Sequence, residues 1–177
     1  ETLGQTVGST FDNKNVGSNK TVTVNSITLA DGSGLAANYS ISAGQTTTAN
    51  ITAKSLTVSG ITASNKTYDG STNVTLTGTA VYSGLVSGDT FDGTYTGAFS
   101  DKNVGTGKTV TITPSYSGAD VNNYSITNHA DLTANITVKS LTVSGITASN
   151  KTYDSTTSAT LGTGAVSYGG LVSGDDF

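Results

Sequence analysis

One stretch of sixteen residues occurs twice in this chain without a single difference. KSLTVSGITASNKTYD runs from Lys54 to Asp69 and returns, letter for letter, from Lys139 to Asp154. Such a repeat constrains the fold strongly, because both copies must be able to adopt the same structure. The period of about 85 residues is far longer than one coil of a solenoid, and it matches a small independent domain.

Further repeated stretches divide the chain. FDNKNVGSNKTVTV returns as FSDKNVGTGKTVTI, NYSI occurs twice, and YSGLVSGDTF returns as YGGLVSGDDF at the end of the chain. We therefore predict three segments: a partial repeat that is the back part of a unit (1–53), a complete repeat domain (54–138) and a partial repeat that is the front part of a unit (139–177). We interpret the chain as a window of a longer array, and completion of its ends by neighbouring chains is the alternative.

Alternating apolar residues predict strands throughout. Val110, Ile112 and Tyr116 alternate with Thr, and a second run of alternating residues favours one buried face: Leu132, Ala134, Ile136 and Val138, followed by Leu141 and Val143 in the opposite phase. A change of phase requires a bulge or a new sheet, so we place repeat boundaries at 54–55 and 139–140. We expect six or seven strands per unit and no helix beyond one turn in GLVSGD.

The fold class follows from these strands and from a composition rich in Thr and Val, which suit a pleated sheet. We predict an all-β protein of tandem, small, immunoglobulin-like β-sandwich domains in an extended rod, with β-grasp-like units as the alternative. No spacer separates the repeats, which favours a stiff arrangement.

Charge and composition exclude several classes of function. The chain has eight Lys, no Arg and a net charge of −4, so we expect no nucleic-acid partner. No apolar run approaches a membrane span, so we expect no membrane insertion, and the absence of Cys excludes disulfides. The chain does not begin with Met, and we expect it to be an excerpt.

Four motifs in order carry a family resemblance: KTYDG, GLVSGD, DKNVGTGKTVTI and NYSI. Together they resemble the YDG-type repeat of large bacterial surface adhesins, including filamentous haemagglutinin-like exoproteins. The resemblance implies secretion or a cell-surface location, and a role in adhesion or biofilm formation without catalysis. It implies a structural segment that acts as a stiff stalk or fibre, with neighbouring repeats or identical chains as partners.

Two alternative functions stay open at this point. One is a module that binds a glycan or a host protein, for which Tyr82, Tyr95 and Tyr116 are the candidate exposed aromatic residues. The other is a self-assembling filament subunit whose partial end repeats join head to tail.

Candidate sites are few. Asp89, Asp92, Asp101 and Asp120 are weak candidates for calcium ligands, and solvated turn aspartates are the favoured interpretation. We expect no other cofactor. Asn-x-Ser/Thr motifs permit glycosylation, with Asn38, Asn73 and Asn123 as candidates.

The remaining polar residues are interpreted structurally. We expect Tyr68 to bury its ring and Asp69 to cap a turn. The single histidine, His129, lies in a polar loop, and no nucleophile has a positioned base, so we predict that the chain is not an enzyme. An isopeptide bond at Lys66 or Lys151 needs burial beside a carboxylic acid, which the sequence does not indicate.

Overall fold

The structure is a computed structural model that describes residues 1–176. Phe177 ends the predicted third segment and aligns in sequence with Phe91, and it lies outside the described residues. Strands and loops make up the described chain, together with two single-turn 3₁₀ helices, so the predicted all-β class is confirmed. Those residues contain no helix that is long and apolar enough to cross a membrane.

Contacts divide the chain into two compact units, each assembled from three segments. The first unit consists of Glu1–Ser59, Val81–Gly93 and Ser115–Asn128; the second consists of Gly60–Ala80, Thr94–Pro114 and His129–Phe177. Four long strands, β4, β6, β7 and β8, have residues in both units. The contact units therefore do not coincide with the predicted sequence repeats.

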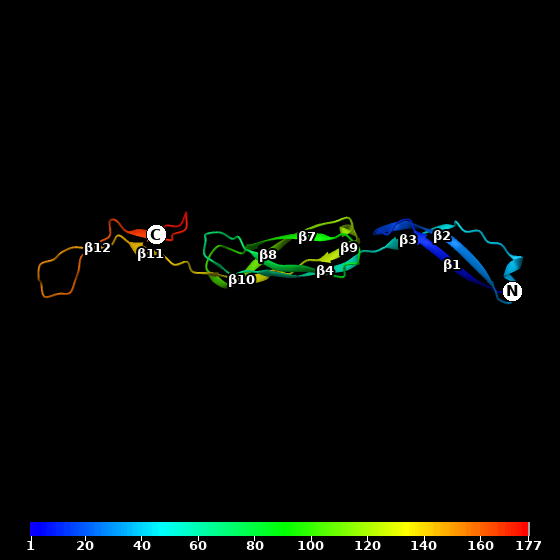
Figure 1. Cartoon of the computed structure of the whole chain (residues 1–177), viewed down its shortest axis with the longest axis horizontal. Coiled ribbons are helices and arrows are strands. Elements are labelled where there is room, and N and C mark those ends of the chain that lie inside the picture. Colours follow the sequence, from blue (N-terminus) through cyan, green and yellow to red (C-terminus); the bar gives the residue numbers. More distant parts are fainter. Residues whose placement is uncertain (177) are drawn as a thin grey trace. The chain divides into compact units, whose positions relative to one another are not determined.

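The first unit contains an antiparallel three-stranded sheet in the order β1–β2–β3, with β1 and β2 side by side in Figure 1. Its strands are β1 (Leu3–Phe11), β2 (Gly17–Asp31) and β3 (Thr46–Ile51). The register of β1 against β2 shifts between Gly8 and Ser9, which marks a bulge. A 3₁₀ turn, η1 (Ala36–Asn38), lies in the connection between β2 and β3.

The complete repeat forms two sheets. A four-stranded sheet has the order β5–β10–β8–β7, and a three-stranded sheet has the order β6–β4–β9. The pairs β5–β10 and β4–β9 are parallel. The bounds of these elements are β4 (Lys54–Ala63), β5 (Lys66–Thr67), β6 (Leu76–Ser83), β7 (Asp92–Phe99), β8 (Gly105–Ser117), η2 (Val121–Asn123), β9 (Tyr124–Thr127) and β10 (Leu132–Thr137).

The last part of the second unit forms two short antiparallel pairs. β11 (Thr142–Ser144) pairs with β14 (Ser167–Gly169), and β12 (Thr147–Ala148) pairs with β13 (Leu161–Gly162). These elements repeat the sequences of β4 and β6. Leu141, Val143 and Ile146 of this part are exposed, whereas their copies Leu56, Val58 and Ile61 in the complete repeat are buried.

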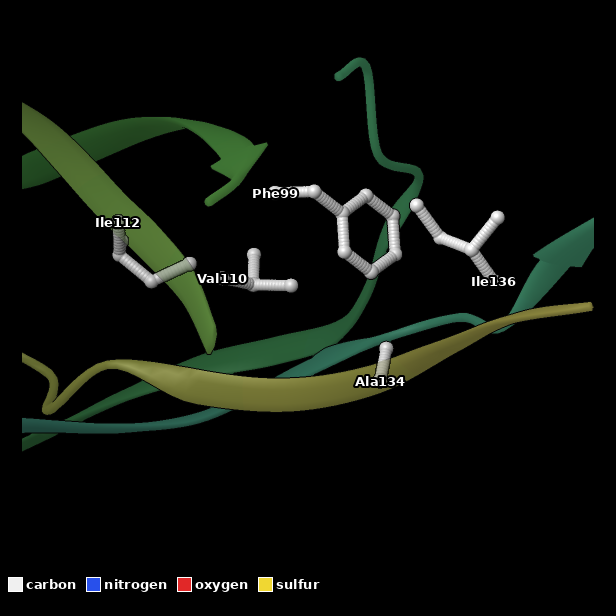
Figure 2. Packing of buried hydrophobic residues seen from close by; sticks show 5 residues of the cluster. All are labelled: Phe99, Val110, Ile112, Ala134 and Ile136. Carbon is white, nitrogen blue, oxygen red and sulfur yellow. The ribbon is translucent and has the colours of Figure 1, made fainter. Parts of the chain in front are cut away.

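The core of the second unit lies on one face of the four-stranded sheet. Phe99, Val110, Ile112, Ala134 and Ile136 are buried together, and the ring of Phe99 lies between Val110 and Ile136 in Figure 2. Ala63 of β4 and Leu76 of β6 are partly buried against this cluster. Burial of each large apolar side chain stabilises the fold by about 1.5–3 kcal/mol. The alternation that predicted this inner face on β8 and β10 is confirmed.

Three apolar positions differ from the prediction. Val138 was expected on the buried face, but β10 ends at Thr137 and Val138 is 74% exposed. Leu141 and Val143 were also expected inside, and both are exposed. Alternation predicts which side chains share a face, but those side chains are buried only where another layer covers that face. Within the described residues, no such layer covers these three positions.

Two local features also refine the prediction. GLVSGD forms turns without a helix, while the unpredicted 3₁₀ turns η1 and η2 each end at the asparagine of NYSI, one residue before its tyrosine. The third position of the Tyr-Asp-x turn is left-handed in both copies, with φ of 77° at Gly70 and 60° at Ser155. Serine pays a steric penalty there that glycine does not.

Candidate functional site: a repeated lysine–aspartate–tyrosine clamp

The DKNV-type loop presents one lysine outward in each copy. In the first copy the Asn13 Oδ1 accepts a hydrogen bond from the amide of Asn15 at 3.0 Å, and in the second the Asp101 Oδ1 accepts one from the amide of Asn103 at 2.8 Å. These side-chain turns fix the loop at the residue before Lys14 and before Lys102. The loop conformation therefore sets the direction of a lysine that follows it immediately.

A second lysine closes the same loop. Lys20 pairs with Asp12 at 2.9 Å, and Lys108 pairs with Asp101 at 2.7 Å. The aliphatic part of each lysine packs against a glycine, Lys20 against Gly17 and Lys108 against Gly105. A Cβ added at either glycine would come within 3.2–3.3 Å of the lysine carbons, so the glycine leaves room for this packing. A long side chain that buries its stem and keeps its ammonium at the surface gains packing as well as charge.

The first clamp lies in the first unit and consists of Lys14, Asp89, Asp120 and Tyr124. The Nζ of Lys14 lies 2.7 Å from the Oδ1 of Asp120 and 3.0 Å from the Oδ1 of Asp89. The hydroxyl of Tyr124 donates to the Oδ2 of Asp89 at 2.6 Å and accepts from the amide of Val86 at 3.0 Å. Each oxygen of Asp89 thus has a different donor.

Backbone contacts support the first clamp. The amide of Val16 donates to the Oδ1 of Asn123 at 2.9 Å, next to Tyr124 in the NYSI motif. The amide of Thr90 donates to the Oδ2 of Asp120 at 2.8 Å, and Asp120 is buried. The DKNV loop of one sequence copy is therefore held against the GLVSGD and NYSI segments of the next copy.

The second clamp lies in the second unit and consists of Lys102, Asp175 and Tyr68. The hydroxyl of Tyr68 donates to the Oδ2 of Asp175 at 2.8 Å, and the Nζ of Lys102 lies 3.6 Å from the Oδ1 of the same carboxylate. Lys102 and Asp175 are the sequence copies of Lys14 and Asp89. The same lysine–aspartate pair therefore forms twice, each time between consecutive copies of the repeat.

Electrostatics in the first clamp favour the charged forms of its ion pairs. The hydrogen bond from Tyr124, followed by that from Lys14, lowers the pKa of Asp89, and Lys14 lowers the pKa of Asp120. The two carboxylates, Asp120 first, raise the pKa of Lys14. Burial and then the bond to Asp89 raise the pKa of Tyr124. The two carboxyl groups therefore stay ionised and Lys14 and Tyr124 stay protonated near neutral pH, which suits a structural contact better than proton transfer.

The second clamp shows the same tendency. The hydrogen bond to Asp175, followed by burial, raises the pKa of Tyr68. Its neighbours Tyr68 and Asp175 raise the pKa of Lys102. The predicted structural role of Tyr68 agrees with its half-buried ring and bonded hydroxyl.

A groove lies beside each clamp, in matching positions of the repeat. The groove at the first clamp has a volume of about 250 Å³ and is lined by Val16, Lys54, Val86 and Tyr124 among others. The groove at the second clamp has a volume of about 430 Å³, and its walls include the copies of three of these residues, Val104, Lys139 and Val172.

The Tyr-Asp-x turn forms the same contacts in both copies. Lys66 pairs with Asp69 at 2.7 Å and Lys151 pairs with Asp154 at 2.8 Å. The Oδ1 of Asp69 also accepts from the amide of Ser71 at 2.9 Å, which confirms the predicted cap. The bonds from Lys66 and then Ser71 lower the pKa of Asp69 to about 2. Each of these lysines forms an ion pair with the aspartate three residues later in the chain.

The four predicted calcium candidates lie in different contacts. Asp89 and Asp120 meet at Lys14, Asp101 pairs with Lys108, and Asp92 accepts from the amide of Gly93. Within residues 1–176 no group of three or more acidic or histidine side chains could hold a metal ion. Calcium binding therefore stays a prediction.

The candidate glycosylation sites differ in access. Asn38 and Asn73 are exposed, whereas Asn123 is half-buried and bonded through its side chain to Val16 and Asn15. Modification at Asn123 would conflict with the first clamp, so the prediction is best kept for the other two.

The three candidate aromatic residues of the binding-module alternative form no exposed cluster within residues 1–176. Tyr82, Tyr95 and Tyr116 are all half-buried. Tyr82 and Tyr116 lie against the ring of Phe91, with centroids 5.0 Å and 5.5 Å away, and Tyr95 packs on the core of the second unit. His129 is half-buried, and its Nδ1 lies 2.7 Å from the carbonyl oxygen of Ala130.

Sequence reasoning missed Lys14 and Lys102 as partners of Asp89 and Asp175. A signal was present, since the stretches KNVG and GLVSGD recur with the lysine and the aspartate unchanged. The sequence did not show that the two side chains lie close in space, because Lys14 and Asp89 are 75 residues apart in the chain.

The comparisons with known proteins give one family. The family model described as YDG domain matches residues 1–49 and 52–134, which together are well over half of the chain. No curated protein and no solved structure matches the chain significantly.

This match corrects two predictions. The YDG domain is known from SRA-type proteins that bind methylated DNA, so the predicted function as an adhesin stalk or fibre, with its binding-module and filament alternatives, is wrong. For the same reason, the prediction that nucleic acid is not a partner is wrong, whereas identical chains and glycans as partners, and the expected lack of membrane insertion, stay predictions. The physical reason is that low net charge alone does not exclude a nucleic-acid partner, because local charge and shape decide binding. The predicted location outside the cell or at its surface stays a prediction.

Proposed function

Because the chain belongs to the YDG domain family, we propose that it is a non-catalytic module of tandem β-sandwich repeats in which a clamp ties each copy to the next. The observation that carries this proposal is the second occurrence of the same contact. Lys14 reaches Asp89 and Lys102 reaches Asp175, and each lysine comes from the copy that precedes its aspartate. A contact that recurs in equivalent positions of two copies is a property of the repeat and not of one location in the chain.

The β-sandwich part of the proposal rests on the core. Side chains of the four-stranded sheet pack with Ala63 and Leu76, which belong to strands of the three-stranded sheet. An immunoglobulin-like sandwich fits this better than a β-grasp unit, since the described residues contain no α-helix to lie across a sheet. The repeat boundaries at 53/54 and 138/139 are part of the same proposal.

The non-catalytic part rests on how the polar groups are engaged. Asp89 and Asp175 each contact a lysine and a tyrosine, and Asp120 contacts Lys14 and the amide of Thr90, so the clamp carboxylates are already occupied by donors. General acid–base catalysis needs a group whose pKa lies near the working pH. The pKa of Asp89 is lowered and that of Lys14 is raised, so both move away from neutral pH.

Hydrogen exchange of a lysine variant tests the clamp. Lys14→Met keeps a long side chain but removes the charge, and Lys54→Met is the control because Lys54 has no ion pair among residues 1–176. Lys14 is largely exposed, so its ion pairs stabilise the fold only as much as surface pairs do. We therefore expect hydrogen exchange at the amides of Val16 and Thr90 to be about twofold to fivefold faster in Lys14→Met than in the parent chain. Unchanged exchange at both amides, or an equal effect of the control, would refute the clamp.

We further propose that the module needs no metal or cofactor. The melting temperature should then agree to within about 1 °C in millimolar calcium chloride and in chelator. A ligand that binds only the folded state raises the melting temperature, so a rise of several degrees in calcium would assign a site to the acidic loops.

A second candidate function is binding of methylated duplex DNA, which only the family match favours. Six of the eight lysines are paired with aspartate in the described chain, and Lys54 and Lys139 are the two that are not. Two phosphate contacts would give a slope of about −2 in a plot of log affinity against log salt.

Fluorescence anisotropy with methylated and unmethylated duplexes at about 50 and 200 mM salt measures that slope. Binding that prefers the methylated duplex and weakens in a Lys54→Ala, Lys139→Ala double variant would establish this second candidate. No binding at the lower salt concentration would reject it.

A further inference from the structure

Three Asp-Gly dipeptides occur in the chain, at 31–32, 69–70 and 92–93. In such a pair the side-chain carboxyl group approaches the next backbone nitrogen most easily, because glycine has no Cβ to hinder the approach. All three aspartates are exposed, so access to water does not distinguish them. The contacts of each carboxyl group therefore decide whether it reacts with that nitrogen.

The carboxyl group of the Tyr-Asp-x turn is held by donors other than its own glycine. The Oδ1 of Asp69 accepts from the Nζ of Lys66 at 2.7 Å, and from the amide and the hydroxyl of Ser71 at 2.9 Å and 3.0 Å. The bonds from Lys66 and then Ser71 lower the pKa of Asp69 from 3.8 to about 2. Attack by a backbone nitrogen requires the protonated carboxyl group, and this shift reduces the population of that form about fiftyfold near neutral pH.

The carboxyl group of Asp31 is bonded to another part of its loop. Its Oδ1 accepts from the amide of Ala36 at 2.6 Å, and the amide of Gly32 donates to the carbonyl oxygen of Gly34 at 3.1 Å. Both reacting groups of this Asp-Gly pair therefore have partners outside the pair.

The third pair differs, because its carboxyl group is bonded to its own glycine. The amide nitrogen of Gly93 donates to the Oδ1 of Asp92 at 2.8 Å. The carboxyl group and the nitrogen are thus held next to each other before any reaction, which is the arrangement that accelerates a ring closure. Of the three pairs, this one is best placed to react.

We propose that Asp92 is a site of spontaneous covalent modification, at which the link to Gly93 isomerises through a succinimide, while Lys66 protects Asp69 from the same reaction. The Gly93 nitrogen attacks the Cγ of the protonated Asp92 carboxyl group and forms an N–Cγ bond, and the proton of that nitrogen leaves with the carboxyl hydroxyl as water. Water then adds to the backbone carbonyl carbon of Asp92, and the bond from that carbon to the Gly93 nitrogen breaks. The product is isoaspartate, with the composition of the chain unchanged. This site goes beyond the proposed clamp function.

The product changes the backbone at a sensitive position. Isoaspartate lengthens the main chain by one methylene group at the first residue of β7, which pairs with β8. The preceding residue, Phe91, has its ring centroid 5.8 Å from that of Tyr124, whose hydroxyl bonds Asp89 in the first clamp. The modification therefore lies one residue from an aromatic contact of that clamp.

Peptide mapping of the aged full chain tests the proposal. The chain is incubated at physiological temperature and neutral pH in water labelled with heavy oxygen, because hydrolysis of a succinimide adds one solvent oxygen at the site. Trypsin releases residues 67–102 as one peptide, so Asp69 and Asp92 are compared within the same molecule. Electron-transfer fragmentation distinguishes isoaspartate from aspartate. We expect label and isoaspartate to accumulate at Asp92 at least about tenfold faster than at Asp69.

Unfolded chain and two lysine variants are the controls. In concentrated urea the contacts are lost, so Asp69 and Asp92 should react at similar rates. Lys66→Met should raise the rate at Asp69 at least about fivefold and leave Asp92 unchanged. Lys108→Met, which removes the ion pair with Asp101, should change neither site.

Three results would overturn the proposal. One is a rate at Asp69 that equals or exceeds the rate at Asp92 in the folded parent chain. Another is an absence of label at Asp92 in the folded chain over the time in which the chain in urea becomes labelled. The third is an unchanged rate at Asp69 in Lys66→Met, because the lysine would then protect nothing.

Discussion

Two isoleucines in identical local sequence provide a matched test of how burial determines stability. Ile61 and Ile146 occupy the same position of the sixteen-residue repeat, but their exposed fractions are 5% and 51%. Replacement by alanine removes three carbon groups at each site, worth about 2.4 kcal/mol of transfer free energy when fully buried. Any difference between the two variants therefore reports environment alone.

At Ile61 the whole transfer term is lost and a cavity is left behind, so we expect Ile61→Ala to cost about 3–4 kcal/mol. At Ile146 about half of the side chain is already in water, and no closed cavity forms. We expect Ile146→Ala to cost about 1 kcal/mol. For a domain of this size, the first change lowers the melting temperature by at least about 12 °C.

Thermal and urea unfolding, followed by circular dichroism, measure both variants against the parent chain. The main cooperative transition should fall strongly in Ile61→Ala and should hardly move in Ile146→Ala. Equal losses in the two variants would refute the reasoning, because they would show that residues 139–176 are packed as tightly as the complete repeat.

Three further outcomes follow from single residues. The pKa of Asp69 is lowered from 3.8 to about 2, so its ionised form stabilises the fold above pH 3.8 and this contribution is lost as pH falls toward 2. Asp69→Asn should therefore reduce the change of the melting temperature between those two pH values, as thermal unfolding at a series of pH values would measure. Gly118→Ala should cost about 1–3 kcal/mol more than Gly88→Ala in urea unfolding, because both glycines have positive φ but only the first would bring its Cβ against the Thr90 carbonyl oxygen. Ser155→Gly should slow amide exchange around 151–156, since glycine accepts the φ of 60° without the steric cost that serine pays.

Strand positions were predictable because burial has a period in the sequence. The alternation over 109–116 placed Val110 and Ile112 on one face of their strand, and that over 132–138 placed Ala134 and Ile136 on one face of theirs; the structure buries all four. The same rule failed at Val138, because nothing in a local pattern says where the covering layer ends.

The clamp was not predictable in this way. Its lysine and aspartate are 75 residues apart, and a surface ion pair leaves no periodic trace in the sequence. The cap at Asp69 was predictable, since an aspartate bonds a backbone amide two residues later through local geometry alone. Contacts within one turn can be read from sequence, whereas contacts across copies needed the fold.

The clamp joins a lysine of one copy to an aspartate of the copy that follows. A gene that gains or loses one whole period still encodes the lysine of each DKNV-type loop about 75 residues before the aspartate of the copy that follows. The number of copies can therefore vary among related genes while the lysine and the aspartate between consecutive copies still pair. Shuffling fragments shorter than a period would break this pairing, and such recombinants should be selected against.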